Sequence, residues 1–155
     1  MMARIQKSIR EKDAGFTLIE LLVVMIIIGV LAAIAVPVFL SQRAKAQDTA
    51  TKSDVGIVGK EIATYFVDGS GVPTVGSASG FWTLTPPSGS ATNIGRVSSG
   101  VALPTGASAT GLGVLASGQT LSSTTWCVAM TNADGADKTF RYSAAKGLEK
   151  GTCVF

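Results

Sequence analysis

The sequence that decides the fold is residues 15–40, GFTLIELLVVMIIIGVLAAIAVPVFL. From Leu21 to Leu40, twenty consecutive residues carry no charge. Counted from Phe16, this run predicts a helix of about 37 Å at about 1.5 Å per residue, which is long enough to cross a bilayer core of roughly 30 Å. We therefore expect an apolar helix over residues 16–40, buried in a membrane or in the core of an assembly.

Glu20 lies inside the apolar stretch of residues 16–40 and is the one charged side chain in it. An ionised side chain costs roughly 2–3 kcal/mol near the centre of a bilayer and less near its edge. A carboxylate in such a segment therefore indicates a functional site, and its partner has to be identified. A position near the lipid headgroups, where the charge is merely tolerated, is the alternative.

Residues 12–22, KDAGFTLIELL, resemble the processing site of a type IV prepilin. In that family a membrane peptidase cuts after the glycine on the cytoplasmic face and N-methylates the new terminus. The resemblance implies that Gly15 ends a leader peptide, that Phe16 is the methylated first residue of the mature chain, and that Glu20 is its fifth. It also implies that the new α-amine of Phe16 and the Glu20 carboxylate pair during assembly, within one helix or between staggered subunits.

Gly29 and Pro37 lie where pilins commonly carry a helix-weakening glycine and proline. Pro37 has no amide donor, so the carbonyl of Ala33 loses its usual helical partner. The resemblance implies that the segment between Gly29 and Pro37 can lose helicity on assembly. A tolerated kink in a membrane helix explains the same two residues.

Two other interpretations of the N-terminus stay open. A secretory signal peptide cut after Ala35 fits the basic start, the apolar run and the small residues before Val36. However, a secretory core rarely contains a glutamate, and it is usually shorter than this run. A plain membrane anchor explains the length but gives no reason for the sequence GFTLIE.

The formal charge of +3 is concentrated at the N-terminus, because residues 1–15 contribute +2 of it. Without these residues the chain has nine basic and eight acidic side chains, so a specific nucleic-acid partner is not expected. The leader charges are instead expected to hold the N-terminus in the cytoplasm. The charged residues of the leader are Arg4, Lys7, Arg10, Glu11, Lys12 and Asp13.

The sequence contains no histidine, the commonest general base and metal ligand. Asn132, Asp134 and Asp137 could offer oxygen ligands to Ca²⁺, but their spacing does not match an EF-hand and such residues are ordinary turn formers. We expect no enzymatic activity, no cofactor and no metal site.

The two cysteines, Cys127 and Cys153, both follow the apolar run. An exported domain enters an oxidising space, so an even count predicts one disulfide, with two buried free thiols as the alternative. A bridge that closes a loop of about 27 residues stabilises a fold by roughly 3–4 kcal/mol in the loop-entropy model.

Beyond Leu40 the sequence turns polar, yet apolar residues recur at helical spacing. This pattern predicts an amphipathic continuation of the helix over residues 41–68, ended by the Gly and Ser residues that follow Asp68. Gly56 and Gly59 each weaken a helix by about 1 kcal/mol relative to alanine, so we expect close packing against them. The apolar face comprises Leu40, Ala44, Thr51, Val55, Val58, Ile62 and Tyr65.

Residues 69–155 predict a globular β domain with a C-terminal disulfide region. The fold class is therefore α+β, a long N-terminal helix packed on a C-terminal antiparallel sheet. The clearest strand pair flanks the turn NADGAD at residues 132–137. Predicted strands cover residues 81–84, 101–103, 112–115, 125–130, 139–143 and 151–155.

The resemblance implies the major pilin of a type IV pilus, a homopolymer used for adhesion, motility or DNA uptake. It implies a prepilin peptidase, an assembly ATPase and a platform membrane protein as partners. The subunit would cross the cytoplasmic membrane once, with its N-terminus in the cytoplasm, before entering a pilus on the cell surface. A pseudopilin of a type II secretion system, a competence pilus subunit and a membrane-anchored binding module stay open as alternatives.

Overall fold

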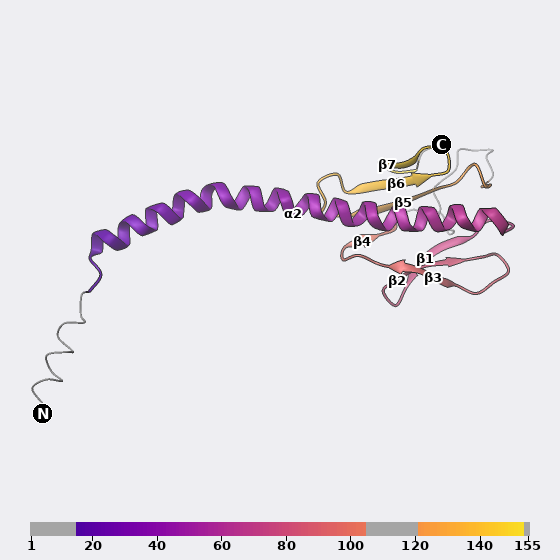
Figure 1. The fold of residues 1–155 in the computed structure, drawn as a ribbon, viewed down its shortest axis with the longest axis horizontal. Helices are drawn as coiled ribbons and strands as arrows, with labels where there is room; N and C mark the ends of the chain where they lie inside the picture. Colours follow the sequence, from indigo (N-terminus) through magenta and orange to yellow (C-terminus); the bar gives the residue numbers. More distant parts are fainter. Residues whose placement is uncertain (1–14, 105–120, 154–155) are drawn as a thin grey trace, which may run out of the picture. The chain divides into compact units, whose positions relative to one another are not determined.

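The computed structural model describes residues 15–104 and 121–153. In these ranges one helix, α2 (Leu18–Asp68), is followed by seven short strands that form two antiparallel sheets (Figure 1). The predicted α+β class is confirmed. The chain divides into two units, Met1–Leu40 and Ser41–Phe155.

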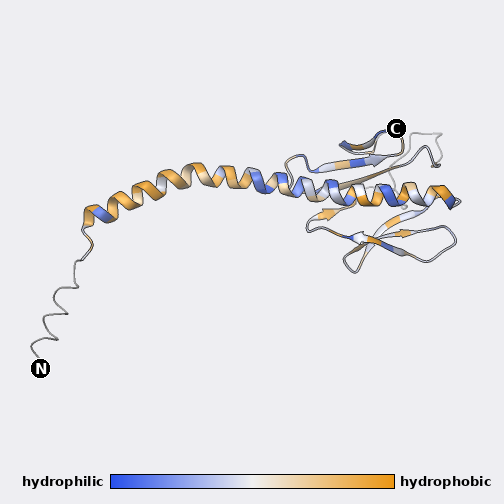
Figure 2. Ribbon diagram, viewed as in Figure 1, coloured by the Kyte–Doolittle hydropathy of each residue, from blue (hydrophilic) through white to orange (hydrophobic). Residues whose placement is uncertain are grey.

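Helix α2 ends at Asp68, where the sequence predicts its end. The amide of Gly69 donates to the carbonyl of Tyr65 at 2.7 Å, and the Tyr65 hydroxyl donates to the carbonyl of Ser70 at 2.7 Å. The tyrosine thus closes the turn that follows the last helical residue. Figure 2 shows that the N-terminal part of α2 is almost uniformly apolar and that its later part is mixed.

The first sheet has the order β1 (Thr74–Ala78), β2 (Phe81–Thr85) and β3 (Thr92–Arg96). Strand β2 confirms the strand predicted at residues 81–84, whereas β1 and β3 were not predicted. Ser79 and Gly80 both have positive φ, 51° and 79°, which is the geometry of a two-residue hairpin turn between β1 and β2.

The second sheet has the order β4 (Val101–Ala102), β5 (Cys127–Asn132), β6 (Thr139–Ser143) and β7 (Gly147–Lys150). Strands β4, β5 and β6 confirm the predictions in their regions. The single sheet that we expected is wrong, because the strands separate into two sheets.

The predicted last strand at residues 151–155 is also wrong. The strand that pairs with β6 is β7, and it ends before Gly151, whose φ of 100° breaks the extended backbone. Residues 154–155 and the strand predicted at 112–115 lie outside the described residues.

The core lies where the second half of α2 meets both sheets. Val55, Val58 and Ile62 are fully buried, as the predicted helix face requires, and Tyr65 packs against this cluster. Leu40, which we placed on the same face, is 56% exposed and lies in the first unit. The sheets contribute Val75, Trp82, Leu84, Val101, Trp126, Val128, Met130 and Phe140.

The two helix glycines differ in their surroundings. A Cβ added at Gly59 would collide with the ring of Tyr142 from β6, so the helix approaches the sheet closely there. A Cβ added at Gly56 would meet nothing within 4 Å. The prediction of close packing is confirmed at Gly59 and wrong at Gly56.

Two buried aspartates, which the sequence analysis did not single out, join α2 to the sheets. Asp54 accepts hydrogen bonds from Trp82 Nε1 at 2.9 Å, from the Ser98 amide at 2.8 Å and from Ser98 Oγ at 2.7 Å. Asp48 accepts from the amides of Asp137 and Lys138, at 3.0 and 3.2 Å, in the turn between β5 and β6. Each sheet is therefore anchored to the helix by one carboxylate.

Candidate processing and assembly site on the N-terminal helix

The helix begins two residues after the predicted scissile bond. Gly15, Phe16 and Thr17 are not helical, and α2 starts at Leu18. Thr17 Oγ1 accepts a hydrogen bond from the Glu20 amide at 3.2 Å. The Thr17 carbonyl accepts the first helical bond, from the Leu21 amide at 3.2 Å. Thr17 is therefore the N-cap of the helix.

Glu20 lies in the first turn of α2, where a negative charge interacts favourably with the helix dipole. Its side chain is exposed. Among residues 15–104 and 121–153, the ion pairs are Arg141–Glu149 and Lys150–Asp137, and neither involves Glu20. The partner of this carboxylate stays a prediction.

The apolar residues around Glu20 have no protein covering. From Phe16 to Leu40 the large apolar side chains are 47% to 84% exposed. The helix is long and apolar enough to cross a membrane, and its most apolar window is 0% buried. Because soluble proteins rarely expose such a surface, it indicates contact with lipid or with other proteins.

Gly29 and Pro37 both lie within the continuous helix α2. A Cβ at Gly29 would meet nothing within 4 Å, so packing within the described chain does not require glycine there. The weakening of this segment during assembly stays a prediction.

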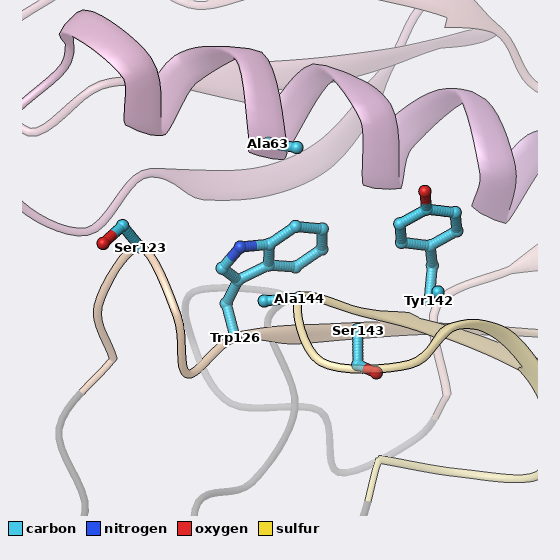
Figure 3. Close-up of a pocket in the computed structure, with 7 residues that line it drawn as sticks. Ala63, Ser123, Trp126, Tyr142, Ser143 and Ala144 are labelled. Carbon is cyan, nitrogen blue, oxygen red and sulfur yellow. The ribbon is translucent and has the colours of Figure 1, made fainter.

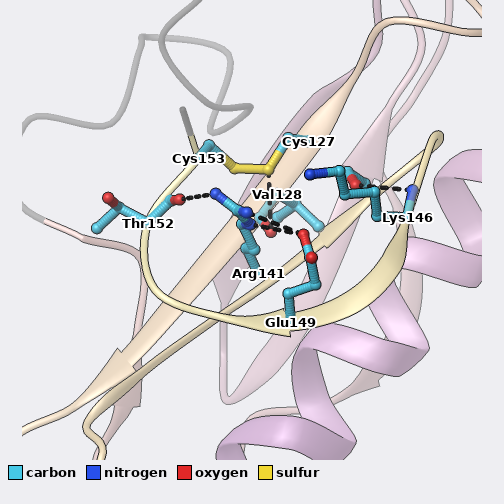
Figure 4. Close-up of polar contacts among 8 residues, drawn as sticks. Cys127, Val128, Arg141, Lys146, Glu149, Thr152 and Cys153 are labelled. Carbon is cyan, nitrogen blue, oxygen red and sulfur yellow. Dashed lines mark hydrogen bonds and ion pairs between the residues drawn. A yellow bond between two sulfur atoms is a disulfide. The ribbon is translucent and has the colours of Figure 1, made fainter. Parts of the chain in front are cut away.

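The predicted disulfide is confirmed between Cys127, at the start of β5, and Cys153, after β7 (Figure 4). The two Cα atoms are 5.8 Å apart, which is ordinary disulfide geometry. Beside it, Arg141 Nη2 donates to Glu149 Oε2 and Arg141 Nη1 donates to the carbonyl of Thr152, both at 2.8 Å. The bridge and the arginine together hold the segment after β7 against the sheet.

A small cavity of about 230 Å³ lies between the C-terminal part of α2 and the second sheet (Figure 3). Trp126 and Tyr142 stack along it, with their ring centroids 6.0 Å apart. Ser123 and Ser143 contribute hydroxyl groups, and Ala63 faces them from the helix. The Ser143 hydroxyl already accepts a bond from the Lys146 amide in the turn before β7.

Two of the possible calcium ligands of the turn after β5, Asn132 and Asp137, are engaged within the protein. Asn132 Oδ1 accepts from the Asp134 amide at 3.1 Å, and its Nδ2 donates to Gln47 Oε1 at 3.0 Å. Asp137 forms an ion pair with Lys150 at 2.8 Å. Within the described part of the chain, no three His, Cys, Asp or Glu side chains gather as a metal site would need.

Thr17 is the site residue that the sequence analysis missed. A threonine followed three residues later by a glutamate, at the start of an apolar run, is the signature of a helix N-terminus. Residues 17–20, TLIE, fit it.

Comparisons with known proteins agree with this N-terminal region. A family model described as a prokaryotic N-terminal methylation motif matches residues 10–36. Type II secretion system core protein G of Pseudomonas aeruginosa is 37% identical over 65 residues, which cover 42% of this chain and 46% of that protein. Fimbrial protein EcpB of Eikenella corrodens is 44% identical over 64 residues, which cover 41% and 40%. A type IV major fimbrial protein FimA of Dichelobacter nodosus is 46% identical over 60 residues, which cover 39% and 38%.

The motif and these relatives support a type IV pilin-like protein. Within that class the relatives include both fimbrial proteins and secretion system proteins. The chain spans less than half the length of the curated relatives it matches. No solved structure matches it.

Proposed function

We propose that this chain is the precursor of a filament subunit, the major pilin of a type IV pilus. The observation that carries the proposal is the uncovered apolar helix from Phe16 to Leu40, whose one charged side chain is Glu20. Lipid covers such a helix in the membrane, and the helices of neighbouring subunits cover it in a filament. The second unit has its own core and is exposed on the filament surface.

Processing prepares the subunit for this exchange. Hydrolysis of the Gly15–Phe16 bond consumes one water, leaves a carboxylate on Gly15 and creates an α-amine on Phe16. Cleavage there puts a positive charge on the α-amine of Phe16, four residues before Glu20 and at the edge of the same apolar surface. The amine of one subunit then pairs with Glu20 of the next, because a misplaced subunit leaves both charges poorly solvated.

The proposal requires a prepilin peptidase, an assembly ATPase and a platform membrane protein. It places the precursor in the cytoplasmic membrane, with residues 1–15 on the cytoplasmic side, and the mature subunit in a pilus on the cell surface. The basic residues among the first 15 support this orientation, since positive charges favour the cytoplasmic side.

Mass spectrometry of the mature N-terminus tests the proposal. We expect a chain that begins at Phe16 and carries one N-methyl group. Gly15→Val should accumulate as uncut precursor, because a side chain at this position obstructs the peptidase, whereas Gly29→Val should still be cut. A mature N-terminus at Val36 would instead establish a secretory signal peptide.

A pseudopilin of a type II secretion system is the second candidate function. The match to core protein G of Pseudomonas aeruginosa favours it. Deletion of the gene separates the two candidates. Loss of sheared surface filaments with normal protein secretion supports the major pilin, and loss of secretion with normal filaments supports the pseudopilin.

A further inference from the structure

The hydrogen bond between Thr17 and Glu20 fixes the first residue of the helix close to the proposed cleavage point. Among residues 15–40, it is the side-chain hydrogen bond that the structure shows. Its acceptor is the threonine hydroxyl, and its donor is the backbone amide of Glu20. The Glu20 carboxylate takes no part in it. The cap therefore depends on the side chain at position 17 and not on the one at position 20.

We propose that Thr17 is a positioning residue for cleavage, which holds the Gly15–Phe16 bond outside the helix and at a fixed distance before it. This inference rests on the proposed function. The helical hydrogen bonds start at the Thr17 carbonyl, so the Gly15 carbonyl precedes them by two residues. One further half-turn of helix would engage the Gly15 carbonyl with the amide of Ile19 and shield it from attack.

Loss of the cap harms this geometry in either of two ways. The helix can extend backward through Phe16, which locks the scissile carbonyl, or its first turn can fray, which changes the distance from the membrane helix to the scissile bond. In both cases a smaller fraction of precursor presents the bond correctly. Loss of an N-cap shifts the local equilibrium by about fivefold, so the cleavage efficiency should fall by about the same factor.

The test measures kcat/KM for release of residues 1–15 from full-length precursor in detergent micelles, with a purified prepilin peptidase. Thr17→Val keeps the β-branched shape and removes the acceptor, so we expect about a fivefold decrease. Thr17→Ser and Thr17→Asn keep an N-cap acceptor and should stay within about twofold of the wild type.

Equal cleavage of the wild type and Thr17→Val would overturn this inference and leave the proposed function intact. Slow cleavage of Thr17→Asn, as slow as that of Thr17→Val, would also overturn it, because the peptidase would then recognise the threonine side chain directly. A wild-type precursor that is not cut at Gly15–Phe16 would overturn the proposed function together with the inference.

Discussion

The two units of this chain bury apolar surface in opposite ways. From Phe16 to Leu40 the large apolar side chains are at least 47% exposed, whereas the core cluster around Val55 and Val58 is at most 7% exposed. The second unit thus buries its core within the chain. The first unit depends on lipid or on other proteins, because about 25 cal/mol per Å² of apolar surface is gained only when water is removed.

The charged groups differ in the same sense. Asp48 and Asp54 are buried in the second unit and receive hydrogen bonds from its own backbone and side chains. Glu20 is exposed, and no ion pair in the described ranges includes it. Polar partners are therefore internal where the core is internal. The first unit must obtain from its surroundings both a cover for its apolar surface and a partner for its charge.

The largest expected effect is the loss of filaments in Glu20→Ala. The substitution keeps the helix and should raise membrane insertion. However, it leaves the α-amine of Phe16 in the neighbouring subunit without its partner. We expect normal processing, a stable membrane pool, and at least a tenfold decrease in sheared filaments, measured by quantitative immunoblotting.

Glu61→Ala is the matched control, since Glu61 is an exposed glutamate of the second half of the helix. Filaments should form normally in this variant, and Glu20→Asp should restore part of the assembly. Wild-type filament numbers in Glu20→Ala would reduce Glu20 to a tolerated charge.

The next effect concerns the stability of the second unit. Asp54→Ala would leave Trp82 Nε1 and both donors of Ser98 without their acceptor. Because a buried donor left without its acceptor costs about 1–3 kcal/mol, and the two Ser98 donors are only partly buried, we expect the free energy of unfolding to decrease by roughly 3 kcal/mol. Urea unfolding followed by tryptophan fluorescence measures this, since both tryptophans, Trp82 and Trp126, lie in the core of the second unit.

Ser53→Ala, at the exposed neighbouring position, controls for the loss of a polar side chain from the helix. It should change the free energy of unfolding by less than about 0.5 kcal/mol. A loss in Asp54→Ala no larger than in this control would show that the carboxylate does not anchor the first sheet.

Much of this fold could be predicted because its signals are strong and local. The uncharged run to Leu40, the spacing of Val55, Val58 and Ile62, and the turn after Asp68 together define α2. The alternation in residues 126–130 identified β5, and the even cysteine count identified the disulfide. The candidate site could be proposed from the sequence for the same reason, because its residues lie in one short motif.

The missed features depend on long-range contacts. Strand β1 buries Val75 as its one core residue, so periodicity gave no signal for it. Asp48 and Asp54 appear polar and solvent-facing until the sheets supply their donors, which lie 28 to 90 residues away in sequence. The last strand was predicted too late in the sequence, at residues 151–155, whereas the bridge holds the residues that follow β7.

The smallest expected effects come from two glycines of the helix, and they have opposite signs. Gly59→Ala places a methyl group against the Tyr142 ring, close to its Cβ and Cγ atoms, which cannot move without shifting β6. Overpacking of this kind costs about 1–3 kcal/mol, more than the helix propensity gained. Gly56→Ala meets nothing within 4 Å and should stabilise the helix by about 0.5–1 kcal/mol. The two variants have the same change in composition and lie three residues apart, so their difference isolates the approach of the helix to the sheet. Urea unfolding of both by tryptophan fluorescence measures it, and two shifts of the same sign would contradict the close contact at Gly59.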